Sequence, residues 1–159
     1  STIIICTNEW KYHAEIKTDL EESLPLVPCL LGEFNQVILN LIVNAVHAIQ
    51  DNPTYKNKKG TITISTRVID GSVEVKLTDT GTGIPANIVH RIFEPFFTTK
   101  SVGKGTGQGL ALSRNVIVNK LGGTINFETT PGQGTSFIIN LPLQEKEKSS
   151  QSSLVQSTL

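Results

Sequence analysis

The chain contains 159 residues, and its 14 lysines and arginines balance 14 aspartates and glutamates to give a net charge of zero. That length suits one domain with a substantial hydrophobic core, and 38% hydrophobic with 18% charged residues is ordinary for a soluble globular protein. Zero net charge argues against general nucleic-acid binding, which requires a broad basic surface. The sequence has no signal peptide and no apolar run of about 18 residues, so we expect a cytoplasmic domain that does not itself enter a membrane.

Two residue types add further expectations. The sequence contains no methionine, so we expect it to be part of a longer protein, whose other segments would carry any membrane attachment. Cys6 and Cys29 lie in apolar surroundings without metal-ligand spacing. This pattern predicts buried free thiols, with a disulfide as the less favoured alternative.

The N-terminal part predicts two strands and a long helix. Thr2–Cys6 is a short β-branched run typical of a strand, and Glu15–Leu20 alternates loosely enough to be its partner. Pro25 and Pro28 then interrupt regular structure. Glu33–Gln50 predicts a helix, because its apolar residues recur at helical spacing. These apolar residues are Phe34, Val37, Ile38, Leu41, Ala45, Ala48 and Ile49.

Two hairpins are predicted in the remaining chain. Thr61–Ile69 and Ser72–Thr78 alternate as strands, and Asp70-Gly71 between them is typical of a tight hairpin turn. Thr124–Thr129 and Thr135–Leu141 predict a second hairpin that completes the sheet.

Between the hairpins, Ala86–Phe93 predicts a short helix, Glu94–Thr106 an irregular loop and Gly109–Leu121 a further helix. The serine-rich and glutamine-rich segment Gln144–Leu159 predicts a flexible tail after a domain of residues 1–143. Helices mixed with hairpins predict an α+β two-layer sandwich. Its mixed, mostly antiparallel sheet would have about five strands, with about three helices on one face.

The segment Gly103–Gly109 holds four of the thirteen glycines and leads directly into a predicted helix. Backbone N–H groups at such a position form a natural phosphate site. The surrounding charge agrees, because Glu94 is the one anion among five cations. Those cations are Arg91, Lys100, Lys104, Arg114 and Lys120. We predict a nucleotide-phosphate site, with a flexible linker as the alternative. The P-loop pattern does not fit, because neither Ser nor Thr follows Lys104.

A polar stripe is predicted on the first helix. Asn40, Asn44, His47 and Asp51 fall within a band of roughly 60° on one helix face. Asparagine is a poor helix former, so two of them one turn apart indicate a use for their amides. An amide oxygen can ligate a hard cation such as Mg²⁺. The alternative is an ordinary solvated face.

Asp79–Gly83 follows directly on a predicted strand. An aspartate there can accept a hydrogen bond from an exocyclic amine, while Gly81 and Gly83 let a flat ligand approach the backbone. The alternative is a simple turn. The glycines also match a dinucleotide-binding fingerprint, which we reject because no second strand ending in an acidic residue follows.

The order of these segments resembles the catalytic, ATP-binding domain of sensor histidine kinases. Asn40–Ala45 resembles the N box, Asp79–Gly83 the G1 box, Phe93–Phe97 the F box and Gly103–Gly109 the G2 box. Gly132–Thr135 matches a further family signature. The resemblance covers residues 1–143 and implies the Bergerat fold of the GHKL superfamily, which includes gyrase B, Hsp90 and MutL.

The resemblance implies ATP and Mg²⁺ as cofactors. Asn44 would hold Mg²⁺ and Asn40 would support it, while His47 and Lys100 would act near the phosphates. Asp79 would accept from the adenine amino group. The implied ATP-binding residues are Asn44, Asp79, Gly81, Gly83, Ile84, Lys100, Lys104, Gly105, Thr106, Gly107, Gln108, Gly109, Leu110 and Thr135. Gln108 departs from the leucine common in the family, which we expect to alter packing only.

Phosphoryl transfer is favoured over hydrolysis by one residue. ATPase members carry a glutamate four residues before the metal-binding asparagine, whereas this chain has Asn40, which cannot act as a general base. The family's acceptor histidine is typically followed by glutamate, and His13, His47 and His90 are not. We therefore expect the acceptor on a dimerisation domain outside this sequence, with a response regulator as the next partner. The alternatives are a GHKL-type ATPase or ATP-gated switch, and a nucleotide-binding module without catalysis.

Overall fold

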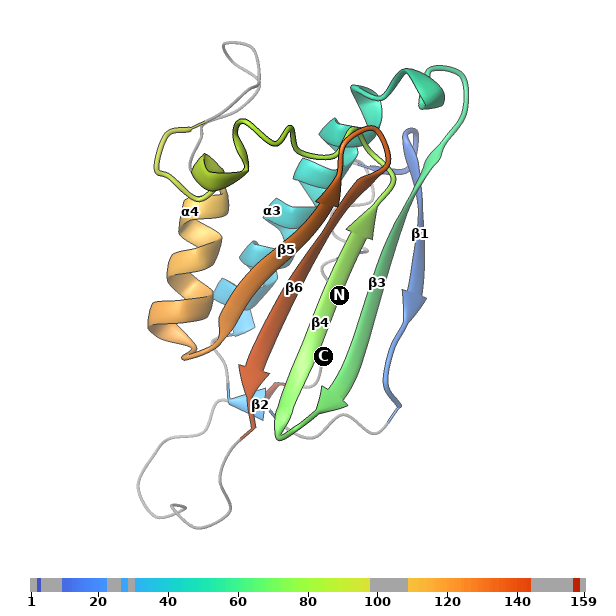
Figure 1. Ribbon diagram of the computed structural model, residues 1–159. Helices are drawn as coiled ribbons and strands as arrows, with labels where there is room; N and C mark the ends of the chain where they lie inside the picture. Colours follow the sequence, from blue (N-terminus) through green and yellow to red (C-terminus); the bar gives the residue numbers. More distant parts are fainter. Residues whose placement is uncertain are drawn as a thin grey trace, which may run out of the picture.

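The computed structural model describes residues 3, 10–22, 27–28, 31–97, 109–143 and 156–157. Its main sheet has five strands in the order β1-β3-β4-β6-β5 (Figure 1). Strand β1 runs parallel to β3, and the other three pairings are antiparallel. The strands are β1 (Ala14–Asp19), β3 (Gly60–Ile69), β4 (Ser72–Asp79), β5 (Thr124–Thr130) and β6 (Gly134–Pro142). A small separate sheet pairs β2 (Val27–Pro28) with β7 (Gln156–Ser157).

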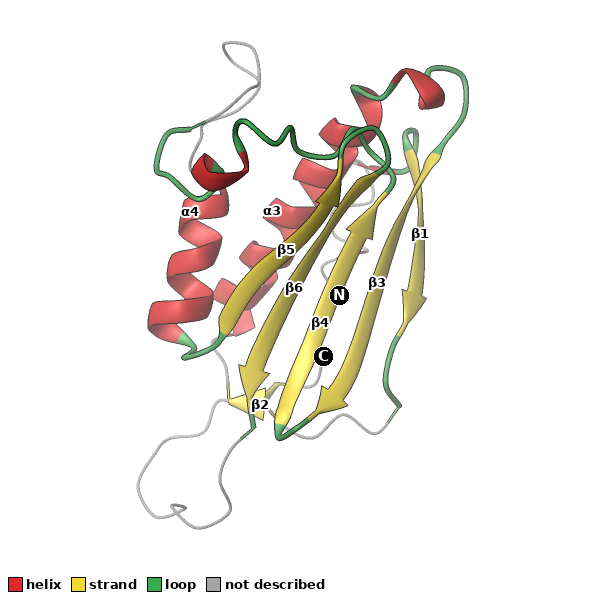
Figure 2. Ribbon diagram, in the orientation of Figure 1, coloured by secondary structure: helices red, strands yellow, loops and turns green. Residues whose placement is uncertain are grey.

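The helices lie together on one face of the main sheet (Figure 2). Helix α3 spans Leu31–Gln50, and α4 spans Gly109–Arg114 before continuing as the π-helical segment η3, Asn115–Lys120. Short 3-10 turns form η1 (Pro53–Tyr55) and η2 (Val89–Arg91). The predicted α+β two-layer architecture with a mixed sheet of five strands is confirmed. Within the described residues, no helix is both long enough and apolar enough to cross a membrane.

The expected number of about three helices on this face is wrong for the part of the chain that the structure describes. Ala86–Phe93 was predicted to be helical, yet only the single turn η2 forms there. The backbone instead makes successive four-residue turns, in which Ile88 N–H donates to Pro85 O and Arg91 N–H donates to Ile88 O. A segment this short cannot offset the cost of helix nucleation.

The core fills the space between α3 and the sheet. Alternate residues of each strand face the helices, so Val73, Val75 and Leu77 of β4 are buried while the residues between them are half-exposed. The same alternation places Asp79, the last residue of β4, on the helix side. The helix contributes its predicted apolar stripe. Its buried residues are Phe34, Val37, Ile38, Leu41, Ile42, Ala45, Val46 and Ile49.

The predicted hairpin turn between β3 and β4 is confirmed. Asp70 and Gly71 both have positive φ, at 49° and 76°. Two such residues suit a type I′ turn, whose twist matches that of the flanking strands.

The N-terminal prediction needs correction. Strand β1, expected at Glu15–Leu20 as the partner of Thr2–Cys6, pairs in parallel with β3 instead. Of Thr2–Cys6 only Ile3 is described, and it is helical rather than extended. The predicted thiols Cys6 and Cys29 lie outside the described residues, as does the predicted tail apart from Gln156 and Ser157.

Candidate functional site

Four elements meet at one end of the molecule (Figure 1). Strand β4 ends there at Asp79, β6 begins there at Gly134, α3 ends there at Gln50 and α4 begins there at Gly109. Asp79 and Thr135 are register partners on neighbouring strands, so antiparallel pairing brings these two predicted site residues side by side. Residues from distant parts of the sequence therefore come to the same end of the molecule.

Asp79 is a buried carboxylate, with 5% of its surface exposed. Burial raises its pKa to about 6, and hydrogen bonds from the backbone of Gly81 and Thr135 partly counteract that rise. The Gly81 N–H donates to Oδ1 over 2.8 Å. At pH 7 the group is thus mainly an ionised hydrogen-bond acceptor in a water-poor position, and it would be stabilised by a ligand that brings an N–H donor.

A chain of hydroxyl groups extends from Asp79 along β6 and β5. Thr135 is 6% exposed, and its Oγ1 lies 3.0 Å from Thr129 Oγ1. Thr129 Oγ1 donates to Gly134 O over 3.2 Å and accepts from Ile84 N–H over 2.8 Å. Either hydroxyl can be the donor of the bond that Thr129 and Thr135 share, and a hydroxyl oxygen has two lone pairs. Thr135 Oγ1 then keeps acceptor capacity beside Asp79.

Gly81 and Gly83 are required by packing within the protein. A Cβ on Gly81 would lie 2.4 Å from Ala48 Cβ and 2.6 Å from the Ala48 carbonyl carbon, in α3. A Cβ on Gly83, which has φ of +69°, would lie 2.4 Å from the carbonyl oxygen of Thr130. The sequence suggested that these glycines admit a flat ligand, and the structure supplies a second reason for them. Because they lack a Cβ, residues 79–83, which we call the Asp79–Gly83 loop, pack closely against α3 and the β5–β6 turn.

The predicted polar stripe lies along α3 between two of these contacts. Asn40, Asn44 and Ala48 follow at intervals of four residues and so share one side of the helix. A Cβ on Gly109, the first residue of α4, would lie 3.9 Å from Asn40 Cβ, while Ala48 touches Gly81. Half-buried Asn44 therefore lies between the start of α4 and the Asp79–Gly83 loop. This places its amide between the two segments predicted to hold phosphate and adenine.

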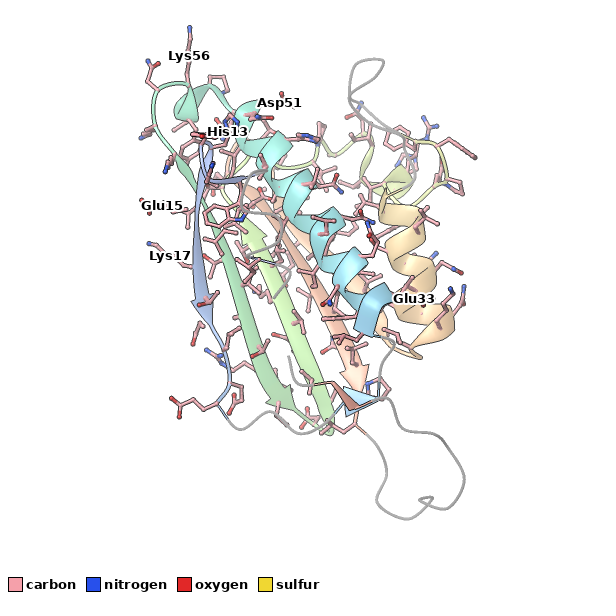
Figure 3. The ribbon with its side chains drawn as sticks, turned by 180° about the vertical axis from the view of Figure 1, so that it is seen from behind. His13, Glu15, Lys17, Glu33, Asp51 and Lys56 are labelled. Atoms are coloured by element: carbon pink, nitrogen blue, oxygen red, sulfur yellow. The ribbon has the colours of Figure 1, made fainter. Side chains whose placement is uncertain are left out.

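The two ends of the stripe differ. Asn40 accepts from Gln36 Nε2 over 3.2 Å, so its amide oxygen is engaged within the helix. His47 is half-buried one turn before the end of α3. Asp51 lies past that end and is exposed, at the opposite end of the helix from Glu33 (Figure 3). The part of the stripe that faces protein is therefore Asn40 to His47.

Residues 32–145 match the model of the histidine kinase-, DNA gyrase B- and HSP90-like ATPase family. The chain belongs to this family. It is 42% identical over 149 residues to the sensor kinase CckA of Brucella abortus (strain 2308), covering 84% of this chain and 15% of that protein. It is 44% identical over 117 residues to the sensor histidine kinase ZraS of Klebsiella oxytoca, covering 73% of this chain and 23% of that one. The chain thus spans under a quarter of either relative.

Solved structures show the same family fold. The nucleotide-free catalytic domain of the histidine kinase ThkA matches with a TM-score of 0.73 and 27% identity, covering 89% of this chain and 87% of that one. Full-length ShkA in complex with AMPPNP matches with a TM-score of 0.72 and 26% identity, covering 89% of this chain and 28% of that one.

Several predicted site residues of this family member fall outside the described residues. Among those the structure describes, Ile84 and Leu110 are half-buried and pack against the core. Gly109 opens α4, and Ser113 Oγ donates back to its carbonyl over 2.7 Å. The predicted residues outside are Lys100, Lys104, Gly105, Thr106, Gly107 and Gln108.

The segment resembling the F box is anchored by aromatic contacts. The ring of Phe93 lies 6.0 Å from that of Phe127, at an interplanar angle of 58°, and the Arg114 guanidinium lies 5.8 Å from the Phe93 ring. Arg91 lies over the Phe97 ring at 4.5 Å. Phe96 is 72% exposed and has a positive φ of 65°. The family member thus holds this segment mainly by side chains near its surface.

Two residues around the site were missed from sequence. Thr129 lies six residues before Thr135 and anchors the chain of hydroxyl groups. Asn52 is buried beside the Asp79–Gly83 loop, whereas the sequence indicated only that the helix ends there. The alternation of β5 could have indicated that Thr129 faces the helices. The role of Asn52 depends on contacts 28 and 29 residues away, which no local pattern reveals.

Proposed function

We propose that this chain is the ATP-binding catalytic domain of a sensor histidine kinase in two-component signalling. The observation that carries the proposal is the buried, ionisable Asp79 beside Thr135, with Asn44 of α3 and the start of α4 around the same position. Relatives named as sensor kinases and the likeness to ShkA, solved with AMPPNP, support it. The kinase activity belongs to a whole protein of which this chain is one part.

Asp79 is proposed to recognise adenine. Its carboxylate would accept a hydrogen bond from the exocyclic amino group, and Thr135 Oγ1 would accept another, directly or through water. An ionised acceptor in a buried position gives a stronger and more selective hydrogen bond than an exposed one. Ile84 and Leu110 would contact the faces of the base, since both are half-buried against the core.

Asn44 is proposed to hold Mg²⁺ through its amide oxygen. Among the residues that the structure describes, no group of three His, Cys, Asp or Glu side chains could form a metal site of its own. A single amide next to bound phosphates fits Mg²⁺, which keeps several waters and takes most other ligands from phosphate oxygens. The ion would neutralise phosphate charge, while Asn40 supports Asn44 and His47 interacts with the phosphates.

The phosphates are proposed to extend from Asn44 towards the start of α4. Backbone N–H groups from Gly105 to Gly109 would bind them, with Leu110 and the helix N-terminus behind. Lys100 and Lys104 would contact the β- and γ-phosphates from the predicted loop Glu94–Thr106. These roles rest on the family motif, because residues 98–108 lie outside the described part of the chain.

The acceptor is proposed to be a histidine of a helical dimerisation domain, from which the phosphoryl group passes to a response regulator. Transfer of this kind requires mainly positioning and charge neutralisation from the ATP-binding domain. Asn40 at the position of the ATPase glutamate is consistent with transfer rather than hydrolysis. Its side chain also accepts from Gln36 in this structure.

A labelling experiment tests the proposal. The chain is incubated with Mg²⁺ and ATP labelled at the γ-phosphate, alone and with the dimerisation domain of its parent protein. We expect acid-labile label on the added domain only, and its loss in Asn44→Ala but not in the exposed control Asn126→Ala on β5. Steady phosphate release without transfer would instead indicate an ATPase. Absence of ATP binding would refute the proposal.

A further inference from the structure

Asn52 is a buried side chain that makes three hydrogen bonds within the described residues, all of them to backbone groups. It lies two residues after α3 and is 5% exposed. Its Nδ2 donates to Thr80 O over 3.2 Å and to Gly81 O over 3.0 Å. Its Oδ1 accepts from Thr54 N–H over 3.1 Å and so caps η1. The donor bonds of the amide therefore join the end of α3 to the Asp79–Gly83 loop, while its acceptor holds η1.

Asn52 and Asp79 hold opposite sides of the same peptide group. The carbonyl of Thr80 and the N–H of Gly81 belong to one planar unit. Asn52 Nδ2 donates to the carbonyl oxygen of this unit, which belongs to Thr80. The N–H of the same unit, which belongs to Gly81, donates to Asp79 Oδ1 over 2.8 Å. Because the unit is rigid, fixing its oxygen also fixes the direction from which the carboxylate of Asp79 receives a hydrogen bond.

The neighbouring bonds leave this peptide group as the adjustable part of the loop. Thr80 N–H donates to Thr61 O over 3.2 Å on one side, and Thr82 N–H donates to Ala48 O over 3.1 Å on the other. These bonds are made by the peptide N–H groups of Thr80 and Thr82. Neither bond fixes the rotation of the Thr80–Gly81 peptide plane that lies between them. Among the described side chains, Asn52 supplies the bonds to the carbonyls of both Thr80 and Gly81.

We propose that Asn52 is a positioning residue for base selection. By holding the Thr80–Gly81 peptide, it orients the Asp79 carboxylate so that one oxygen is directed towards the ligand. Adenine presents an amino donor to that oxygen, whereas guanine presents a carbonyl acceptor in the equivalent place and is repelled. This inference rests on the proposed adenine site at Asp79.

Asn52→Asp distinguishes the proposed role in holding the Thr80–Gly81 peptide from the role of Asn52 in capping η1. Aspartate has the same shape and can still accept from Thr54 N–H. When ionised it cannot donate to the carbonyls of Thr80 and Gly81, and when protonated it can donate to only one of them, so at least one of the two bonds is lost. Asn52→Ala removes both functions. Asn126→Asp is a matched control, because it makes the same chemical change at an exposed position on β5.

The experiment measures dissociation constants for Mg-ATP and Mg-GTP by competition against a fluorescent ATP analogue. For Asn52→Asp we expect the preference for ATP over GTP to narrow about tenfold, which corresponds to 1.4 kcal/mol. Most of the change should lie in ATP affinity, and Asn126→Asp should keep the wild-type preference. A general structural defect would weaken both nucleotides equally and leave their ratio unchanged.

The outcomes separate this inference from the proposed function. Wild-type preference for ATP with an unchanged ratio in Asn52→Asp overturns the role of Asn52 alone. A wild-type protein that does not bind ATP, or that binds GTP equally, overturns the adenine site as well. Should Asn52→Asp not fold, hydrogen exchange of the Asn52 Nδ2 protons in the wild-type ATP complex decides. Slow exchange supports the role, and fast exchange overturns it.

Discussion

The Asp79–Gly83 loop and the Phe93–Phe97 segment lie at the same end of the molecule but are held differently. Buried backbone hydrogen bonds to α3 and β3, together with glycines that leave no space for a side chain, fix the loop. Aromatic and guanidinium contacts hold the segment, in which Phe96 is 72% exposed.

This difference indicates that the loop is suited to recognising a base and the Phe93–Phe97 segment to changing its conformation. Backbone bonds in a buried position break only when the structure opens, so the loop can act as a fixed template for a base. Contacts made by exposed side chains exchange readily with water, and opening them requires less free energy. Substitutions in the two regions should therefore differ in their effects on stability and binding.

The largest stability loss is expected for Gly81→Ala. The new Cβ would lie 2.4 Å from Ala48 Cβ and 2.6 Å from backbone. Overpacking against backbone should lower the free energy of unfolding by about 3 kcal/mol. Gly109→Ala is the control, because its Cβ would meet Asn40 at an ordinary 3.9 Å, and its effect should be under about 1 kcal/mol. Urea unfolding measures both, and equal losses would show that the loop is not the tighter region.

Asp79→Asn should weaken ATP binding and raise the stability of the nucleotide-free domain. Losing the charged acceptor should weaken ATP binding at least about 100-fold, or 2.7 kcal/mol. The nucleotide-free domain should become more stable at pH 7 by about 1–3 kcal/mol, because burial raises the pKa of Asp79 from 3.8 to about 6. Calorimetric titration and urea unfolding check the two effects. A variant that is less stable than wild type at pH 7 would contradict the cost assigned to the buried charge.

Phe93→Ala should loosen the second region without disturbing the first. The ring contacts of Phe93 with Phe127 and Arg114 would be lost, which should cost about 2 kcal/mol for a half-buried aromatic residue. Amide exchange should accelerate within residues 92–97, while Gly81 stays protected. If Gly81 also lost its protection, the two regions would be one cooperative unit.

Acid should weaken binding at the loop in a defined range. Asp79 has a raised pKa of about 6, so its contribution to nucleotide-free stability is complete below about pH 4 and is lost as pH rises through 6. Binding requires the ionised form and therefore has the opposite dependence. Affinity for adenosine should fall about tenfold from pH 7 to pH 5. Adenosine carries no phosphate that titrates in this range, and Asp79→Asn, which cannot titrate, should show no such fall.

The smallest effect is expected for Phe96→Gly. Phe96 has a positive φ of 65°, a conformation that costs a residue with a Cβ roughly 1 kcal/mol. Its side chain is largely exposed, so little packing is lost, and the variant should be unchanged or more stable by under about 1 kcal/mol. Thermal unfolding measures this. A clear destabilisation would show that the Phe96 ring makes contacts that matter.

Patterns within one element predicted most of the fold. The period of α3, the alternation of β3 and β4, and the Asp70-Gly71 turn all hold in the structure. Pairing between distant elements was harder to predict. The parallel register of β1 with β3 joins Ala14 to Gly60, and nothing in the local sequence indicates that partner.

The residues of the candidate site show the same contrast between local patterns and contacts across the fold. Asp79 was predicted from its place at a strand end, and Asn44 from the cost of asparagine in a helix. Asn52 was missed because its partners lie across the fold. Ala86–Phe93 was predicted as a helix because it follows Pro85, and that position alone does not offset the cost of starting a helix.

The pairing of β4 with β6 has a consequence for folding kinetics. Thr78 and Ser136, whose hydroxyl oxygens lie 2.8 Å apart, are separated by 58 positions in the chain. Contacts of such high sequence separation form late, because the long intervening loop must first be closed at an entropic cost. Asp79 meets Thr135 only after this closure, whereas Asn40 and Asn44 are placed as soon as α3 forms. In a refolding experiment, nucleotide affinity should therefore return after helical circular dichroism does.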